Sequence, residues 1–565
     1  MNDIVWLTMR RLRTPLIVMI LAYFLSVMAM VLVPGADTLG KPVRVSFLDA
    51  AYFVAVMSTT IGFGEIPYPF TDAQRLLVFL IIFPNVVAWL YSIGTILGLF
   101  LDAEFRGVLR RARFARRVRW LGEPFYIVCG FGNTGTMVAR GLLNRGLQAV
   151  VLEGNQDAVY RMMLADEFAH VPALACDVTD RRNLELAGLH QASCQGVIVT
   201  TNQDQANLTI AITSKLLRPK LPVFARSESE AVSDNMASFG TDHLVNPYAI
   251  FAERLFLALS SPIKYLVQDW LISVPGSALR ELLEPPRGRW IVCGAGRFGS
   301  RMAAQLKRSG LPFTVVETNP ERLAPYPGGV LGPGTEAPTL QEAGIGDAAG
   351  IIAGTGDDID NLSIAMTALA LNERLFVVAR QEMQANDVLF DACGAKLVAR
   401  RGLIVARRIL AVTTTPLLPV FLDHLIGQAD EFAEHAATRL RAVLDGRAPS
   451  LWAVRMDDPL NVGVRTAHEA GIELRLGHLS RNLRREEEEQ LACVCLVLER
   501  DSERVFLPGD DYPLRDGDRL LYAGRGLARR EMLRMLGDPV WLMNAATGEP
   551  WPRSAVWRLF GRLSR

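Results

Sequence analysis

The stretch Ser58–Tyr68 reads STTIGFGEIPY and separates two apolar segments that are long enough to cross a bilayer. Non-helical backbone inside a membrane is tolerated only where protein buries it or where it lines a wet cavity. Glycines at alternate positions let successive carbonyl groups turn to one side without a Cβ penalty. A ring of such carbonyls can replace the hydration shell of K⁺. We therefore predict a selectivity filter made by Thr60, Ile61, Gly62, Phe63 and Gly64, with K⁺ bound by the carbonyls of Thr60, Ile61, Gly62 and Phe63.

The two flanking apolar segments are predicted to be membrane-spanning helices. Thr14–Val33 contains no charge and follows three arginines, and the second span runs from about Arg75 to Phe105. Glu104–Trp120, which overlaps its end, holds seven arginines. Because arginine and lysine mark cytoplasmic flanks, both termini are placed in the cytoplasm of a multi-pass plasma-membrane protein. A signal peptide is the alternative for the first segment, but no small-residue cleavage site follows it.

Two further features belong to the predicted pore. Phe47–Thr59 is apolar but too short to span, which predicts a re-entrant helix whose partly negative C-terminal end favours a cation. Pro84 removes a helix hydrogen bond, which predicts a bend or break near Leu80–Asn85. Polar and apolar residues at a seven-residue spacing could face the pore, namely Asn85, Ser92 and Leu99. Pro84, Gly94 and Gly98 are candidate gating residues, and a tolerated kink without a gating role is the alternative.

Composition sets limits on the rest of the chain. With 565 residues, half of them hydrophobic and 21% charged, the chain should hold several domains and a soluble part larger than the membrane part. The net charge of +1 gives no argument for nucleic-acid binding. The seven cysteines form no CxxC pair and the histidines no HExxH motif, which argues against a disulfide framework and a zinc enzyme.

The soluble part contains a duplication. FYIVCGFGNTGTMVARGLLNRGLQAVVLEGNQD from Phe125 corresponds to RWIVCGAGRFGSRMAAQLKRSGLPFTVVETNPE, which begins at Arg289 and reaches its strand at Trp290. Each copy has a strand, a GxGxxG turn, a helical pattern and a second strand that ends in an acid. The glycines are Gly130, Gly132 and Gly135, then Gly294, Gly296 and Gly299, and the acids are Glu153 and Glu317. This pattern predicts dinucleotide-type folds that bind NAD or ADP, while glycines kept only for packing are the alternative.

Further candidates for the nucleotide sites lie in the glycine turns and at strand ends. Those of the first copy are Phe131, Asn133, Thr134, Asp177, Thr200, Thr201 and Arg226. Those of the second copy are Ala295, Arg297, Phe298, Thr355, Gly356 and Arg380. Arg226 and Arg380 could reach a phosphate or a partner domain, and a structural salt bridge is the alternative. In the second copy we expect Thr335 at the position of Asp177.

These motifs resemble a known family. The order Thr60–Glu65 closely resembles the Thr-Val-Gly-Tyr-Gly-Asp signature of potassium channels, and the duplicated unit resembles RCK (TrkA-N) domains. Arg504–Arg525 is similar to the strand-rich TrkA-C subdomain. The whole resembles two-transmembrane-helix prokaryotic potassium channels with tandem RCK domains, of the multi-ligand-gated type. The resemblance implies a homotetramer in the lipid bilayer, with a cytosolic gating ring that binds an adenine nucleotide and no enzymatic activity.

The predicted fold is a membrane α-helical pore domain plus two α/β Rossmann-like RCK domains and a small α+β C-terminal subdomain. The pore domain is 1–105, and 106–122 is a basic linker. The first RCK domain is 123–245 with a helical crossover at 246–287, and the second is 288–410 with a crossover at 411–450. The TrkA-C-like subdomain is 451–540, and 541–565 is a tail.

Other interpretations remain open at the level of sequence. The run Glu486–Glu489 could bind a divalent cation such as Ca²⁺, although a solvated loop is the simpler explanation. A membrane-anchored NAD-dependent oxidoreductase would need an acid or base beside the nicotinamide. A regulatory subunit of a potassium transporter would have tandem RCK-like domains but no spans or filter of its own.

Overall fold

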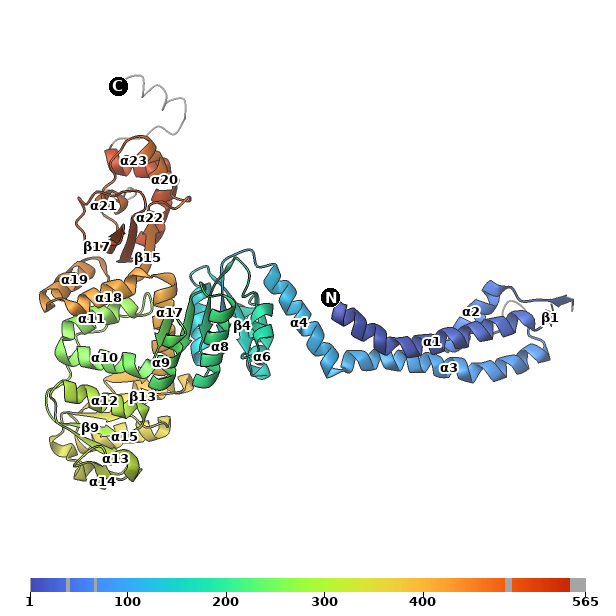
Figure 1. Cartoon of the computed structure of the whole chain (residues 1–565), viewed down its shortest axis with the longest axis horizontal. Coiled ribbons are helices and arrows are strands. Elements are labelled where there is room, and N and C mark those ends of the chain that lie inside the picture. Colours follow the sequence, from blue (N-terminus) through green and yellow to red (C-terminus); the bar gives the residue numbers. More distant parts are fainter. Residues whose placement is uncertain (1, 37–40, 63, 66–68, 483–489, 549–565) are drawn as a thin grey trace, which may run out of the picture. The chain divides into compact units, whose positions relative to one another are not determined.

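The computed structural model describes residues 2–36, 41–62, 64–65, 69–482 and 490–548, and of residues 2–11 only the backbone (Figure 1). These residues divide into two compact units, with the boundary between Gly122 and Glu123. The first unit is almost entirely helical, and the second contains three sheets of four or six strands.

The first unit is built on four helices. They are α1 (Asn2–Leu32), α2 (Phe47–Ser58), α3 (Asp72–Leu101) and α4 (Ala103–Arg119), with a two-stranded ribbon of β1 (Gly35–Ala36) and β2 (Pro42–Val43). By length and composition, the Leu12–Leu32 part of α1 and the whole of α3 are able to cross a membrane. The two predicted spans and the short helix between them are thus confirmed as helices. The basic run is itself a helix, α4, because the Asp102 side chain caps its start at Phe105 N–H (2.9 Å).

Helix α3 corrects two expectations about the pore. Pro84 lies inside an unbroken helix, so the helix does not break there, and the bend that was expected as the other possibility stays a prediction. Asn85, Ser92 and Leu99 do not face away from the chain but are buried, and the first two contact α1. The Asn85 amide donates to Ser26 Oγ (2.5 Å), and the Ser92 hydroxyl donates to the carbonyl of Pro15 (3.1 Å). For Asn85 and Ser92 the seven-residue spacing therefore marks the contact between α3 and α1 and not the pore lining, because polar side chains in spanning helices hydrogen-bond across helices.

The second unit begins with two parallel six-stranded sheets, ordered β5-β4-β3-β6-β7-β8 and β11-β10-β9-β12-β13-β14. The first comprises β3 (Phe125–Cys129), β4 (Gln148–Glu153), β5 (Ala173–Ala175), β6 (Cys194–Val199), β7 (Val223–Arg226) and β8 (His243–Val245). The second comprises β9 (Trp290–Cys293), β10 (Phe313–Glu317), β11 (Val330–Leu331), β12 (Gly350–Ala353), β13 (Phe376–Gln381) and β14 (Leu397–Arg400). Both have the strand order of a doubly wound nucleotide fold, which confirms the predicted fold class.

Helices cover the two sheets. Those of the first copy are α5 (Asn133–Leu143), α6 (Gln156–Leu164), α7 (Arg181–Leu186), α8 (Asp204–Leu217) and α9 (Glu230–Ser238). Those of the second are α12 (Arg297–Arg308), α13 (Pro320–Leu323), α14 (Ala337–Glu342), α15 (Asp358–Leu371) and α16 (Asp387–Ala392). The second copy is the shorter one, because α13 has four residues where α6 has nine.

The two domains exchange their last helices. Helix α10 (Pro247–Ser260) follows the first sheet but packs against α12, and its Tyr248, Phe251 and Leu255 join the core of the second sheet (Figure 1). Helix α17 (Arg401–Thr414) follows the second sheet but packs against α5 of the first domain. The expected boundary at residue 410 is therefore wrong, because it falls inside α17, whose apolar face belongs to the other domain's core.

The remaining elements form the C-terminal part. Helices α11 (Pro262–Ile272), α18 (Leu417–Gly427) and α19 (Asp430–Val443) pack against one face of an antiparallel sheet ordered β15-β18-β16-β17. Its strands are β15 (Ser450–Arg455), β16 (Cys493–Arg500), β17 (Glu503–Phe506) and β18 (Arg519–Gly524). The other face holds α20 (Val462–Glu469), α21 (Leu476–Leu479), α22 (Gly526–Gly537) and α23 (Pro539–Thr547). Residues 541–547, expected in a tail, belong to α23, which buries Leu542 and Met543 in this core.

Candidate functional site

The predicted filter segment follows the C-terminal end of α2. The N–H groups of Thr60 and Ile61 donate back to the carbonyls of Met57 and Val56, each at 3.1 Å, so the segment leaves the helix directly. Thr60, Gly62 and Gly64 have φ values of 63°, 68° and 100°. Alternate residues thus adopt the left-handed backbone that we predicted for the two glycines, and Thr60 adopts it as well. Phe63 lies outside the described residues.

Glu65 ties the far side of this segment to the start of α3. Its carboxylate pairs with the Arg75 guanidinium (2.8 Å) and accepts a hydrogen bond from Phe70 N–H (2.7 Å). An added Cβ on Gly62 or Gly64 would meet nothing within 4 Å, so the positive φ, and not a lack of space, favours glycine at these positions.

Each of the three glycines in the first turn occupies its position for a different physical reason. Gly130 has a φ of 95°, and a Cβ on Gly135 would lie 1.9 Å from the carbonyl oxygen of Gly130. Gly132 caps α5 with no side-chain hydrogen bond, and a Cβ there would meet nothing within 4 Å. The N-terminal N–H groups of α5 are therefore open to a ligand at the position where a pyrophosphate binds in this fold.

These elements enclose a cavity of about 790 Å³, which we call the nucleotide cavity. Eight of the predicted site residues line it: Gly130, Phe131, Gly132, Asn133, Glu153, Asp177, Thr200 and Thr201. Three do not: Thr134 and Gly135 pack inside α5, and Arg226 lies behind the wall. The sequence prediction missed Arg140, Arg161, Thr179, Asn202 and Gln203, which also line it. No GxGxxG-type motif marks these five, since they reach the cavity from helix faces, from the turn after β5 (Thr179) and from the turn after β6.

The acids of the nucleotide cavity are held by main-chain donors. Glu153, at the end of β4, accepts hydrogen bonds from the N–H groups of Phe131 and Asn155, the latter at 2.8 Å. A carboxylate accepts about four hydrogen bonds, so Glu153 retains capacity for ribose hydroxyls. The hydroxyl and N–H of Thr179 donate to Asp177 (2.7 and 2.9 Å) and hold the pKa of that carboxyl below its usual value.

In the second copy, Glu317 makes the same two main-chain contacts as Glu153, to the residue after the first glycine and to the asparagine two residues on, and a third contact to Thr318 N–H. Glu317 is only 7% exposed and accepts from the N–H groups of Ala295 (2.6 Å), Thr318 (2.9 Å) and Asn319 (3.0 Å). Burial works to raise its pKa, but these hydrogen bonds hold the pKa below the ordinary value. Phe298 is 1% exposed and packs against Tyr248 and Phe251 of α10. Through its bond to Ala295 N–H, Glu317 stabilises the glycine turn of its own copy.

The strand register corrects one residue assignment. Glu153 pairs with Ala175 and Glu317 pairs with Leu331, so the residue two positions beyond each strand is Asp177 in one copy and Pro333 in the other. Thr335 corresponds to Thr179, and the expectation that it replaces Asp177 is wrong by two positions. The second copy still lacks an acid at this position.

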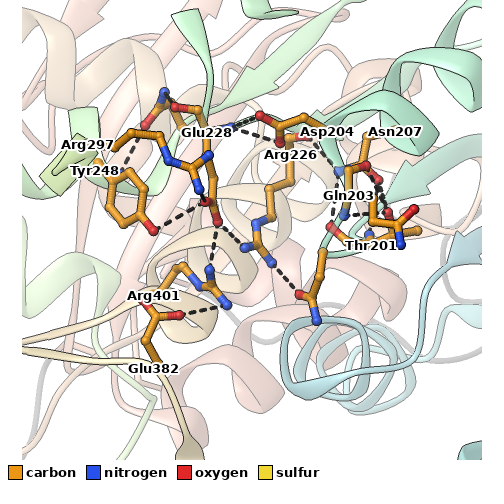
Figure 2. A network of polar contacts seen from close by, with 12 residues as sticks. Thr201, Gln203, Asp204, Asn207, Arg226, Glu228, Tyr248, Arg297, Glu382 and Arg401 are labelled. Carbon is orange, nitrogen blue, oxygen red and sulfur yellow. Dashed lines mark hydrogen bonds and ion pairs between the residues drawn. The ribbon is translucent and has the colours of Figure 1, made fainter. Parts of the chain in front are cut away.

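The two domains meet around one buried carboxylate. Glu228, 6% exposed, pairs with Arg226 of β7, with Arg297 of α12 (3.2 Å) and with Arg401 of α17 (2.8 Å) (Figure 2). The Tyr248 hydroxyl of α10 donates to it at 3.2 Å. Burial works to raise the pKa of Glu228, but the three arginines outweigh it and hold the pKa below the ordinary value. Four elements from both domains therefore share this one anionic centre.

Arg226 and Arg380, which end their strands, both form structural salt bridges, the alternative given above to phosphate binding. Arg226 is 2% exposed, and it also donates to the Asn202 side chain (3.2 Å), which lines the nucleotide cavity. Arg380 pairs with Glu382 (2.5 Å) and donates to the Tyr248 hydroxyl (2.8 Å). Glu382 also pairs with Arg401 at 2.8 Å, so the pairs of the two copies are joined (Figure 2).

Three candidates of the second copy remain, namely Thr355, Gly296 and Gly356. Thr355 donates through N–H and hydroxyl to Asn361 (both 2.9 Å), as Thr201 does to Asn207 (3.1 and 2.6 Å). Gly296 and Gly356 stand in open space, where a Cβ would meet nothing within 4 Å. Within the described ranges no group of three His, Cys, Asp or Glu could hold a metal ion, and Glu486–Glu489 lies outside those ranges.

Known families match both units. The family model described as "Ion channel" matches residues 15–101, and the "TrkA-N domain" model matches 126–247 and 290–400. Among curated relatives, Potassium channel protein 1 of Methanocaldococcus jannaschii is 26% identical over 246 residues, which are 43% of this chain and 68% of that protein. Probable potassium channel protein 2 of the same organism is 23% identical over 216 residues, 37% of this chain and 60% of its own length.

Among solved structures, "GsuK channel bound to NAD" aligns with 94% of this chain and 99% of its own, at 16% identity and a TM-score of 0.48. The domain order found in the fold is the order in which the family models match. The chain therefore carries a segment that matches ion channels, followed by two domains that match the TrkA-N family.

Proposed function

We propose that this protein is a potassium channel that assembles as a homotetramer in the plasma membrane with both termini in the cytoplasm. The observation that carries the proposal is the alternating left-handed backbone of Thr60, Gly62 and Gly64 between a re-entrant helix and a spanning helix. One chain supplies a quarter of a carbonyl ring, so four copies are needed to coordinate K⁺. The ion-channel match supports a channel, and the potassium-channel relatives support K⁺ as the ion.

An adenine nucleotide, NAD or ADP, binds in the first TrkA-N domain and regulates conductance. The residues present fit such a ligand: uncapped N–H groups at α5 would bind the phosphates, and Glu153 would accept from the ribose. The ribose acid favours a ligand without a 2′-phosphate. In the second copy, Glu317 is engaged by three main-chain N–H groups, which favours a structural role.

The Glu228 centre is the element that couples ligand to pore in this proposal. Asn202 lines the nucleotide cavity and bonds Arg226, Arg226 pairs with Glu228, and Glu228 pairs with Arg297 and Arg401 of the second domain's helices. A nucleotide shifts the domains only by its differential affinity for their two arrangements. Binding that changes the position of Asn202 would act on that balance.

The experiment is K⁺ flux from liposomes that contain the full chain, with NAD or ADP supplied on the side of the soluble domains. We expect flux that the nucleotide changes, and a loss of at least tenfold in nucleotide potency for Glu153→Ala, because the ribose contact is removed. Asp157→Ala, on an adjacent side chain outside the cavity, is the matched control. Flux that ignores both nucleotides in the unmodified protein would overturn the regulatory part, and NAD turnover without flux would favour an oxidoreductase.

A second proposal is that the run Glu486–Glu489 binds a divalent cation such as Ca²⁺. This site shares no residue with the nucleotide cavity.

A further inference from the structure

A second cavity, of about 650 Å³, lies in the soluble unit where the proposed function assigns no ligand. Its wall is formed by α5 and the turn after it, by the residues following β13, by α17, and by the C-terminal subdomain at β15 and α22. The volume is in the range of small-molecule sites. We call it the arginine cavity.

Positive charge dominates its lining. Six arginines line the arginine cavity, namely Arg140, Arg145, Arg400, Arg401, Arg407 and Arg529, against two acids, Glu382 and Asp387. Both acids are already engaged, Glu382 by Arg401 (2.8 Å) and Asp387 by Arg400 (3.4 Å). The cavity therefore holds an excess of positive charge that its own carboxylates do not balance.

Three of these arginines lack an acidic partner. Arg140 pairs with Glu167 at 2.6 Å. Together with Arg400 and Arg401, three of the six arginines therefore have acidic partners. Within the part of the chain that the structure describes, Arg145, Arg407 and Arg529 make no ion pair. Arg145 donates only to the carbonyl of Gly141 on its own helix (3.0 Å).

Among these three arginines, Arg407 has the clearest need for an anionic partner. Its Nε atom is buried without a hydrogen-bond partner. Burial and the neighbouring charges of Arg254, Arg280 and Arg400 lower its pKa to about 10, and Asp269 offsets this only in part. Asp269 is itself paired with Arg254 at 2.6 Å. Arg407 is partly buried, and a buried N–H group without a partner is costly, so an anion at this position would reduce that cost.

The rest of the wall is apolar. Leu271, Ile272, Leu403, Leu410 and Leu418 line the same cavity. Arginine forks match the oxygen geometry of phosphate groups, whereas leucine side chains suit a ring or aliphatic portion. The combination fits a small molecule with one charged end and one uncharged end.

We propose that the arginine cavity binds a phosphate-bearing small molecule, with its anionic group held by Arg407 and drawn in by Arg145 and Arg529, and its uncharged part on the leucine wall. Asn133 and Arg140 line this cavity and the nucleotide cavity alike. The two ligands would therefore contact the same helix, α5. The site does not depend on the proposed channel activity, because it rests on charge and cavity geometry alone.

The test is calorimetric titration of the purified full chain in detergent with inorganic pyrophosphate as the probe. We expect Arg407→Gln and Arg529→Gln each to weaken binding by about tenfold or more, because each removes a charged hydrogen-bond donor. Arg530→Gln, on the exposed neighbour of Arg529, should retain the unmodified affinity. Arg280→Gln should change the affinity less than Arg529→Gln does, because Arg280 acts on Arg407 only through its charge and lines a separate cavity of about 220 Å³ that shares Arg400 and Arg407 with this one.

Four outcomes would overturn the proposal. They are the absence of pyrophosphate binding up to about 10 mM, unchanged affinity in both Arg407→Gln and Arg529→Gln, a loss in Arg280→Gln with none in Arg529→Gln, and a loss only in Gly132→Ala. The third would move the ligand to the smaller cavity, and the last would place it in the nucleotide cavity. Arg529 is partly exposed, so Arg529→Gln gives a folded test protein even if Arg407→Gln does not.

Discussion

At the scale of single residues, we expect opposite effects from alanine substitutions at the second and third glycines of the first turn, Gly132 and Gly135. A Cβ at Gly132 meets no atom within 4 Å, whereas a Cβ at Gly135 would lie 1.9 Å from the Gly130 carbonyl. Gly132→Ala should therefore leave the thermal midpoint nearly unchanged but weaken NAD binding about tenfold, because the methyl group occupies the approach of the pyrophosphate. Gly135→Ala should destabilise the domain by about 3 kcal/mol.

Calorimetric NAD titration and thermal unfolding of the two variants, side by side, check this prediction. The second copy offers a matched pair, since Gly296 stands in open space and a Cβ on Gly299 would lie 1.7 Å from the Gly294 carbonyl. If only the first copy binds the nucleotide, Gly296→Ala leaves NAD affinity unchanged. Equal effects of Gly132→Ala and Gly296→Ala on affinity would contradict the assignment to the first copy.

The limits of sequence reasoning are visible at this scale. Gly130, Gly132, Glu153 and Asp177 follow a motif with fixed spacing, and the structure brings these four to one cavity. The position of Thr335 does not follow from spacing, because only the strand pairing shows that Pro333 corresponds to Asp177. Glu228 carries no motif, since its importance comes from three arginines that are distant in sequence or lie in other elements.

At the scale of elements, helix α3 is held to α1 by side chains that were expected in the pore. Asn85→Ala should destabilise the pore unit by about 1 kcal/mol, since the bond to Ser26 Oγ is lost in an environment without water. Thr95→Ala is a control, because the Thr95 hydroxyl bonds only the carbonyl of Tyr91 on its own helix. Thermal unfolding in detergent measures the difference, and equal midpoints for both variants would contradict this contact between α3 and α1.

The junction between the two TrkA-N domains should be sensitive to acid. The folded-state pKa of Glu228 lies below its unfolded value, so its stabilising contribution is present above about pH 4.3 and is lost as the pH falls through the folded-state pKa. Replacement of this buried partner, Glu228→Gln, should cost about 3 kcal/mol at neutral pH. The gap between the unmodified protein and this variant should close toward low pH.

Thermal midpoints measured from neutral to acidic pH test this, with Glu230→Gln as the control on an exposed side chain that lies 3.9 Å from Arg301. Glu228 does not line the nucleotide cavity, so Glu228→Gln should keep NAD affinity while its flux response to NAD weakens. A gap that stays constant across the pH range would show that the Glu228 charge does not hold the junction.

The exchange of α10 and α17 shows why elements were easier to predict than their partners. Both helices follow from their apolar periodicity. Which sheet each one covers depends on the fold of the other copy, and α17 has no Asn-Pro start like that of Asn246 and Pro247. The boundary at residue 410 failed for this reason.

At the scale of the whole molecule, the order of parts could be derived from the sequence: two spans, a filter segment, a basic link, two nucleotide folds and one strand-rich subdomain. Each part has a local signature, such as span length, a glycine spacing or a turn motif. The arginine cavity has none, because its six arginines come from α5, α17, α22 and adjoining residues that only tertiary structure brings together.

The central claim is that Ser58–Glu65 forms a K⁺-selective pore, and the reversal potential of single channels tests it most directly. The full chain in a planar bilayer, with K⁺ on one side and Na⁺ on the other, should give currents that reverse close to the K⁺ equilibrium potential. Gly62→Ala should abolish them, because its φ of 68° is strained for any residue with a Cβ. Currents that reverse near zero, or no current under any nucleotide condition, would contradict the account.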